Sequence, residues 1–200
     1  LADGCPLSGN VTEDTLERVR TEDTRVAIVA HVAGWPCEMD SIMEWGRRHD
    51  IRIVEDCAQA CGASIHDRQV GTYGDAAAFS FCQDKIMSTG GEGGAVTTSD
   101  AQVHERMWSY RDHGKMYGGF DPSKSQDQPE LLGMNLRMTA MQAAIGCAQL
   151  RQLPAMLRQR QANVSHIQTM LHEMDDIQIH VPSDPISAAW YMLPCRVPEM

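Results

Sequence analysis

The chain contains 200 residues, of which 42% are hydrophobic and 22% are charged, as is typical of a globular domain with a substantial core. Its formal net charge of −10 argues against nucleic acid or an anionic membrane surface as the main partner, because both attract a positively charged face. No apolar run approaches the ~20 residues that cross a bilayer, and LADGCPLSGN is not typical of a signal peptide.

The seven cysteines and eight histidines do not follow the spacing of a metal site. Cys57 and Cys61 do not form a C-x-x-C pair, and no second pair follows with zinc-finger spacing. An odd number of cysteines, mostly in apolar or helical contexts, is typical of reduced thiols. We therefore expect a cytoplasmic protein without a metal site.

Segments with helical and strand-like patterns alternate along residues 12–98. Thr12 is a candidate N-cap for a helix in TEDTLERVR, and EMDSIMEWGRRHD places its apolar residues on one side of a second helix. The β-branched run VAIVAHV predicts a strand buried on both faces. Three further strands are predicted in IRIVED, AAAFSF and GGAVTT. This alternation with short connections predicts an α/β fold, with a mostly parallel sheet flanked by helices on both faces.

The second half of the chain is predicted to contain a long loop and a long helical region. Residues 114–133 are polar and contain glycine and proline, and loops of this length are often functional. Residues 139–174 are strongly helical, with Pro154 marking a break or the first turn of a second helix. From about Ile177 the sequence returns to strand-like character.

Lys85 stands between an apolar strand and a glycine-rich turn, in AFSFCQDKIMSTGGEGGAVTT. A P-loop does not fit, because its glycines precede the lysine, and the G-x-G-x-x-G fingerprint is absent as well. Two interpretations stay open. Lys85 is either a solvated loop lysine or a lysine in a pocket, where desolvation and neighbouring charge leave a neutral amine that can attack a carbonyl.

Asp56 ends a predicted strand in IVEDCAQACGA, at the position where ligands bind in open α/β sheets. Glu55 precedes it, so the alternation of side chains points the two carboxylates to opposite faces, and Gln59 can share the side of Asp56. Alone, Asp56 is equally compatible with a helix N-cap. With Lys85 at the next strand end, it is better explained as a carboxylate paired with a buried cation. The pyridinium nitrogen of pyridoxal phosphate is such a cation.

The run VEDCAQACGASIHDRQVGTYGDAAAFSFCQDKIMSTGGEGGAV resembles the DegT/DnrJ/EryC1/StrS family, the pyridoxal-phosphate-dependent sugar aminotransferases of fold type I. The resemblance extends to HVAGWPCEMDSIMEWGRRHDIRIVEDCAQA upstream and to MNLRMTAMQAAIGCAQL downstream, and it covers most of residues 10–155. It implies that Lys85 forms the Schiff base with the cofactor and then acts as the general base and acid of a proton shift.

The resemblance also implies a set of cofactor contacts. Asp56 would bind the pyridine nitrogen, Ala58 would pack on the ring face, and Gln59 would reach the ring hydroxyl. Ser80 would bind the phosphate, and Asn135 would reach the phosphate of the neighbouring subunit in a homodimer with shared active sites. From local sequence alone, Asn135 is instead explained as a cap of the following helix or a residue that stabilises the turn.

The implied reaction moves an amino group, with glutamate as donor, to a keto sugar that is usually nucleotide-linked. Lysine at position 85 favours transamination over the dehydration of a related branch, which carries histidine there. Family members are nearly twice as long, so we expect residues 1–150 to be a large cofactor-binding domain without its first part. Residues 151–200 would be a linking helix and the start of a smaller domain. The alternative is a non-catalytic or truncated relative that keeps the dimer surface but lacks a complete cofactor site.

Overall fold

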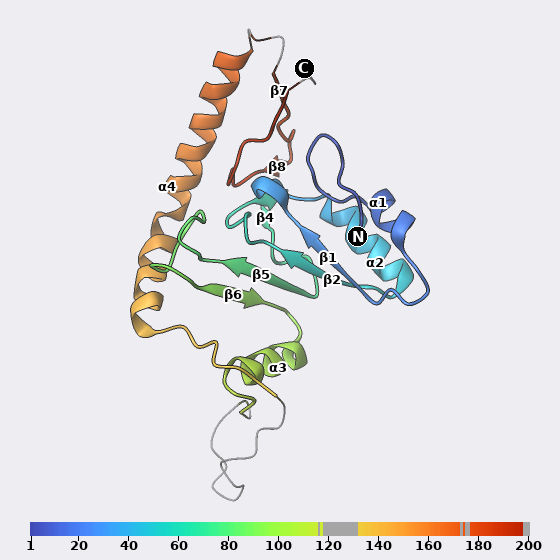
Figure 1. Cartoon of the computed structure of the whole chain (residues 1–200), viewed down its shortest axis with the longest axis vertical. Coiled ribbons are helices and arrows are strands. Elements are labelled where there is room, and N and C mark those ends of the chain that lie inside the picture. The colour runs from blue at the N-terminus through green and yellow to red at the C-terminus, as the bar shows by residue number, and fades with distance from the viewer. Residues whose placement is uncertain (116, 118–131, 173, 175–176, 198–200) are drawn as a thin grey trace, which may run out of the picture.

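The computed structural model describes residues 1–115, 117, 132–172, 174 and 177–197. A four-stranded sheet lies at the centre, and in the view of Figure 1 α4 runs along its left end while α1 and α2 lie toward its right end. The helices are α1 (Glu13–Val19), the short 3-10 helix η1 (Val32–Gly34), α2 (Met39–His49), α3 (Ala101–Arg111) and α4 (Ala140–Leu171). The strands are β1 (Val26–Ala30), β2 (Arg52–Asp56), β3 (Ser64–Ile65), β4 (Arg68–Gln69), β5 (Ala76–Ser80), β6 (Gly94–Thr97), β7 (Gln178–Ile179), β8 (Ile186–Ser187) and β9 (Cys195–Arg196).

The central sheet has the strand order β1-β2-β5-β6. β1 pairs with β2 and β2 with β5 in parallel, so that Ala30, Asp56 and Ala78 are neighbours across the sheet. β6 runs antiparallel to β5, with Gly94 opposite Ser80. The predicted α/β class and mostly parallel sheet are confirmed, and the carboxyl ends of β1, β2 and β5 meet at one edge.

Local signals in the sequence set the helix ends. Thr12 caps α1 in a capping box with Thr15, and Asp100 caps α3 through its side chain. α2 ends at Asp50, whose φ of 53° lies in the left-handed region that commonly closes helices. α3 is not among the predicted helices; Ser109 is its one fully buried residue, and Val103, Met107 and Trp108 are only half-buried.

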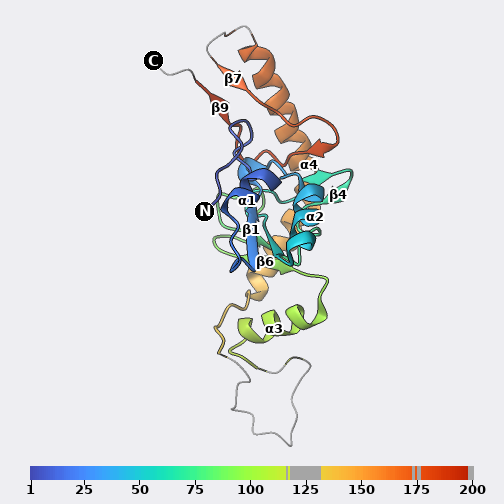
Figure 2. The same cartoon turned by 90° about the vertical axis from the view of Figure 1, so that its right-hand side faces the viewer.

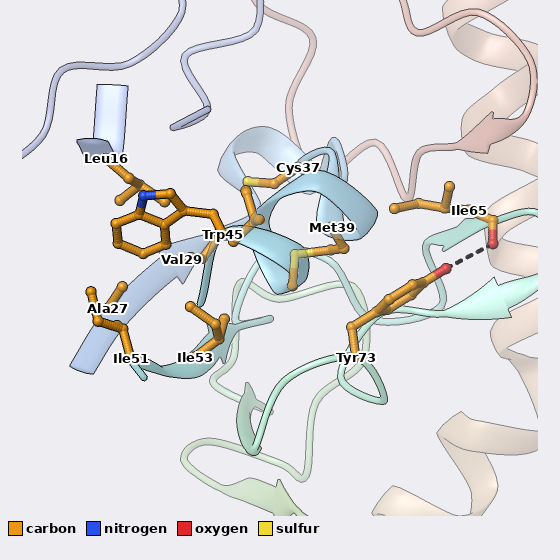
Figure 3. Packing of buried hydrophobic residues seen from close by; sticks show 11 residues of the cluster. Leu16, Ala27, Val29, Cys37, Met39, Trp45, Ile51, Ile53, Ile65 and Tyr73 are labelled. Atoms are coloured by element: carbon orange, nitrogen blue, oxygen red, sulfur yellow. Dashed lines mark hydrogen bonds between the residues drawn. The ribbon is translucent and has the colours of Figure 1, made fainter. Parts of the chain in front are cut away.

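The main hydrophobic core lies between α2 and the face of the sheet that carries Val29. Leu16 of α1 and Trp45 of α2 belong to this cluster, and Tyr73 closes it by donating its hydroxyl to the Ile65 carbonyl at 3.0 Å (Figure 3). The predicted apolar side of α2 is its buried side, since Met39 is fully buried with Trp45. Burial of such side chains is the dominant stabilising contribution to the fold.

One face of the central sheet is left uncovered by the described elements. Val29 lies on the covered face and is 0% exposed, whereas Ile28 on the other face is 70% exposed and Val96 is 56% exposed. α1, α2 and α4 all pack on the face that carries Val29 and Ala77. Two expectations are therefore wrong for the described residues: that β1 is buried on both faces, and that helices flank both faces of the sheet. Alternate side chains of the strand point away from these helices.

α4 runs without interruption through Pro154, so the predicted break at this residue is wrong. Pro154 lies on the exposed side of the helix, and the Leu150 carbonyl that loses its backbone donor belongs to an exposed residue. Leu153 is buried on the opposite side and anchors the helix in the core. The domain boundary expected at residue 150 falls inside α4, and the division of the chain stays a prediction.

Two small sheets complete the described fold, one of order β4-β3-β8 and one formed by β7 and β9. They confirm the strand-like character expected beyond Ile177. Figure 2 shows α3 and the β7–β9 pair at opposite ends of the molecule's long axis. The predicted loop 114–133 lies outside the described residues except at 114, 115, 117, 132 and 133. No helix within the described ranges has the length and hydropathy needed to span a membrane.

Candidate active site

Asp56 and Ser80 lie on the same face of the sheet, at the carboxyl ends of neighbouring strands. Asp56 ends β2 opposite Ala78 of β5, and Ser80 is the next residue of β5 on that face. It is the uncovered face, and both residues are partly exposed. Lys85 follows in a turn, where its backbone N–H donates to the Cys82 carbonyl at 3.1 Å. One edge of the sheet thus carries a carboxylate and a hydroxyl, and the turn that follows β5 carries Lys85.

The Asp56 carboxylate organises the chain that leaves β2. Its Oδ1 accepts a hydrogen bond from the Ala58 N–H at 2.9 Å, and residues 57–63 form turns and no helix. The helix N-cap interpretation of Asp56 is therefore wrong. Within the described residues no hydrogen bond reaches Oδ2, so one carboxylate oxygen can bind a cationic ligand.

Gln59 is held in one orientation by the loop after β1. Its Oε1 accepts from the Ala33 N–H at 2.7 Å, which leaves the amide nitrogen as the donating end of the side chain. Ala33 has a φ of 59°, uncommon for a residue with a Cβ. A Cβ on the adjacent Gly34, whose φ is 84°, would meet the Gln59 carbonyl oxygen at 2.7 Å. This tight turn therefore fixes the Gln59 side chain with its amide nitrogen as the donating end.

Ser80 occupies the start of the turn that leaves β5. Its Oγ accepts from the Cys82 N–H at 3.3 Å, so the hydroxyl hydrogen can be donated to an anion. The base of this turn is closed by a backbone hydrogen bond of 2.8 Å from Phe81 to the Gly93 carbonyl. The glycine-rich segment noted in the sequence thus forms a closed turn that carries Lys85.

The segment after β8 brings Tyr191 to Lys85. The Lys85 Nζ lies 4.5 Å from the centroid of the Tyr191 ring, and the Tyr191 hydroxyl donates to Asp84 Oδ2 at 2.7 Å. This hydrogen bond raises the pKa of Tyr191 and lowers the pKa of Asp84, so the phenol stays protonated and the carboxyl ionised at neutral pH. The sequence does not predict this pair, because its members stand 107 positions apart. The one local signal is the position of Asp84 beside Lys85.

On the covered face, Glu55 connects three parts of the chain. It is 0% exposed, and it accepts from the N–H groups of Gly71, Tyr73 and Gly74 at 2.7–2.8 Å and from His31 Nε2 at 3.2 Å. Burial by itself raises the pKa of this carboxyl, but the hydrogen bonds from His31, Gly74 and Gly71 outweigh it, and the pKa is lowered. Glu55 is therefore an ionised, satisfied carboxylate that faces away from the site.

His31, Glu55 and Cys57 bring possible metal-ligand atoms within 4.8 Å of one another in buried side chains. The His31 Nδ1 accepts from the Cys37 N–H at 3.0 Å, so its Nε2 carries the hydrogen that is donated to Glu55. Burial raises the pKa of the Cys57 thiol, which disfavours the thiolate that binds metals. The lone pairs that a metal needs are thus used within the protein, and we assign no metal to this cluster.

Asn135 lies beside the C-terminal end of α3. It forms an isolated antiparallel bridge with Asp112, and its Oδ1 accepts from the Arg137 N–H at 3.5 Å. The helix α4 is capped by Thr139, so Asn135 stabilises a turn and is not the cap. Among the described residues, no hydrogen bond joins Asn135 to Ser80 or to the other predicted cofactor contacts.

The family profile of the DegT/DnrJ/EryC1/StrS aminotransferases matches residues 1–200. The chain belongs to this family. One relative is the GDP-perosamine synthase of Caulobacter vibrioides, 38% identical over 161 residues that make up 80% of this chain and 42% of the relative. The L-glutamine:2-deoxy-scyllo-inosose aminotransferase of Streptomyces fradiae is 33% identical over 193 residues, 94% of this chain and 45% of the relative.

Solved structures show the same fold for this DegT/DnrJ/EryC1/StrS chain. The aminotransferase from Psychrobacter cryohalolentis superimposes with a TM-score of 0.87 at 40% identity. The matched region makes up 95% of this chain and 51% of the chain of that aminotransferase. DesV of S. venezuelae superimposes with a TM-score of 0.88 at 30% identity, over 98% of this chain and 51% of its own. The predicted fold type I architecture is thus confirmed, and the chain spans about half the length of the curated relatives it matches.

Proposed function

We propose that this chain forms the cofactor site of a pyridoxal-phosphate-dependent aminotransferase that moves an amino group to a nucleotide-linked keto sugar. The proposal is supported by Asp56 and Ser80 on one sheet face at the carboxyl ends of β2 and β5, with Lys85 in the turn that follows β5, in a chain of this family. A relative named for GDP-perosamine supports the substrate class. We propose glutamate as the amino donor, and assays should include glutamine because another relative is named for it.

The residues at this edge fit the charges of pyridoxal phosphate. The Asp56 carboxylate would offer one oxygen to a protonated pyridine nitrogen, and Ser80 would offer a hydroxyl hydrogen to a phosphate. The Gln59 amide nitrogen is turned to donate to a ring hydroxyl, and Ala58 is small enough to lie under a ring. When bound, the cofactor supplies the electron sink of the reaction.

Lys85 carries the proton chemistry of the proposed function. Its Nζ would hold the cofactor at the aldehyde carbon, with release of water, and once displaced by the amine of the donor it would act as the general base and general acid of the proton shift. The turn that leaves β5 positions its backbone through the hydrogen bond to Cys82. A positioned base of this kind typically contributes 10²–10⁴-fold in rate.

We also propose a homodimer with shared sites in the cytoplasm. The side-chain oxygen of Asn135 accepts a hydrogen bond from the Arg137 N–H. The side-chain nitrogen of Asn135 therefore remains as a donor for the phosphate group in the partner's site. A donor supplied by the other subunit would couple cofactor affinity to dimerisation. All seven cysteines are free thiols, which supports a reducing compartment.

The cofactor link can be tested directly on the chain, because the sequence contains three lysines, Lys85, Lys115 and Lys124. The protein is incubated with pyridoxal phosphate, its visible absorbance is recorded, and the link is reduced with borohydride before peptide mapping. We expect visible absorbance and a label on Lys85. The Lys85→Arg variant should lose both, whereas Lys115→Arg, a matched change at an exposed lysine, should keep both.

An equal label on all three lysines, or an unchanged label after Lys85→Arg, would overturn the proposal. The alternative of a non-catalytic relative predicts neither visible absorbance nor a selective label. Amino transfer from glutamate to a nucleotide-linked keto sugar is then measured by the formation of 2-oxoglutarate.

A further inference from the structure

The segment that carries Tyr191 is fastened to the fold on both sides. The Trp190 side chain is 4% exposed, and its indole N–H donates to Gln161 of α4 at 2.6 Å. Arg160 of α4 donates to the Trp190 carbonyl at 2.8 Å, and the Ala189 N–H donates to the Gly34 carbonyl at 2.8 Å. Tyr191 is therefore held between α4 and the loop after β1.

The backbone next to Tyr191 is strained. Trp190 has a φ of 52°, a left-handed conformation that costs free energy for a bulky residue. Such residues persist where the surrounding contacts over-determine them, and they are common at functional sites. Here the strained residue directly precedes the ring that faces the Lys85 amine.

The surroundings of the Lys85 amine are polar and negatively charged. The face of the Tyr191 ring attracts a cation, and its hydroxyl orients the Asp84 carboxylate next to Lys85. The ring face and the adjacent carboxylate therefore hold the amine at one position, beside Tyr191.

We propose that Tyr191 and Asp84 are positioning residues that define where the Lys85 amine rests whenever it is not attached to the cofactor. This inference rests on the proposed function, since it concerns the same lysine. An amine that must leave and return to a reacting carbon does so from a fixed place if its free state is ordered. Tyr191 supplies the ring face, and Asp84 fixes the orientation of that ring by accepting the hydrogen bond of its hydroxyl group.

The resting place predicts a distinct signal from Lys85 in the cofactor-free protein. The lysines are reductively methylated with ¹³C-formaldehyde and observed by NMR, because a methyl group above an aromatic ring is shifted upfield. We expect an upfield signal for Lys85 relative to Lys115 and Lys124. Tyr191→Leu should remove the shift, whereas Tyr191→Phe, which keeps the ring, should retain most of it.

A second measurement follows the reactivity of the amine. Acylation of Lys85 by an amine-directed reagent at fixed pH is compared with that of Lys115. The loss of an exposed cation–π contact in Tyr191→Leu should speed acylation of Lys85 about two- to five-fold relative to Lys115. Asp84→Asn, which keeps the ring but removes the charge, should speed it as well.

An unshifted Lys85 signal in the parent protein, or acylation ratios unchanged in both Tyr191→Leu and Asp84→Asn, would overturn the inference. If Tyr191→Leu disturbs the fold, the signals of Lys115 and Lys124 will also move. The inference is then tested with Tyr191→Phe and Asp84→Asn alone. These readouts need no cofactor. A failure of selective cofactor labelling at Lys85 is therefore distinguishable from a failure of the resting place.

Discussion

Glu55 and Asp56, consecutive residues of β2, hold their carboxylates on opposite faces of the sheet and in opposite environments. Glu55 is completely buried and accepts four hydrogen bonds, whereas Asp56 is partly exposed and accepts one from Ala58. The first carboxylate fastens the end of β2 to its surroundings. The second keeps one oxygen without a hydrogen bond from the described residues, and this is the oxygen that we propose for the cofactor.

Replacing Glu55 with Gln should destabilise the fold. One oxygen of Glu55 accepts from two N–H groups and the other from an N–H and His31, so an amide NH₂ in either place faces two donors. We expect the free energy of unfolding in urea to fall by about 3 kcal/mol. The matched change Asp56→Asn should cost less than about 1 kcal/mol, and equal losses would contradict the assignment of Glu55 as the structural carboxylate.

Acid should weaken the fold partly through Glu55. Its pKa in the folded state lies below the ordinary value of 4.5, so the unfolded chain takes up the proton first. Its contribution to stability is complete above pH 4.5 and is lost as the pH falls through the lower folded value. Glu17, with a pKa lowered to about 2 by hydrogen bonds from Arg20 and Trp45, acts in the same direction.

The pH dependence of unfolding therefore distinguishes the buried carboxylate from the others. We expect the free energy of unfolding to decline less steeply below pH 4.5 in Glu55→Gln than in the parent protein. Glu17→Gln serves as the comparison at an exposed position. Parallel pH profiles for Glu55→Gln and the parent would show that Glu55 is not held ionised by the fold.

Replacing Asp56 with Asn should weaken cofactor binding while preserving the fold. The amide keeps the volume and one acceptor for the Ala58 N–H but removes the charge that pairs with a pyridinium nitrogen. We expect a loss of about 1.5–3 kcal/mol in the affinity for pyridoxal phosphate, measured by absorbance titration. Turnover should fall further, because an unprotonated ring is a poorer electron sink. An unchanged affinity and rate would remove Asp56 from the site.

The shared site can be tested by subunit mixing in the assembled enzyme. A Lys85→Ala chain and an Asn135→Trp chain should each be inactive alone. In a mixed dimer one site carries both defects and the other carries neither, so activity should return in part. No recovery after verified subunit exchange would assign Asn135 to the structure of its own chain, where it bonds to Arg137.

Pro154 should lower the stability of α4. Pro154→Ala restores a backbone donor to the Leu150 carbonyl, so we expect the free energy of unfolding to rise by about 1–3 kcal/mol. Gln152→Ala, a change at an exposed position of the same turn, should alter it by less than about 0.5 kcal/mol. A loss of stability in Pro154→Ala would show that the proline is needed for the shape of the helix.

Properties that depend on neighbours in sequence were predictable from the sequence. Side-chain alternation in β2 separates Glu55 from Asp56, because successive residues of a strand point to opposite faces. The N-cap at Thr12 and the apolar side of α2 follow from spacing within one or two helical turns. The positions of Asp56 and Lys85 at the ends of successive predicted strands were enough to suggest a common edge, since parallel strands end together.

Features that depend on which distant segments meet were decided by tertiary structure. A β-branched run is compatible with burial on one face or two, and packing of α1, α2 and α4 on the same face left Ile28 exposed. Proline disfavours a helix interior locally, but burial of Leu153 and the exposure of Pro154 keep α4 continuous. Tyr191 contacts Asp84 and Lys85, although more than a hundred positions separate it from them in the sequence. No local pattern predicts this contact, because the distance between such residues is fixed only when the intervening chain has folded.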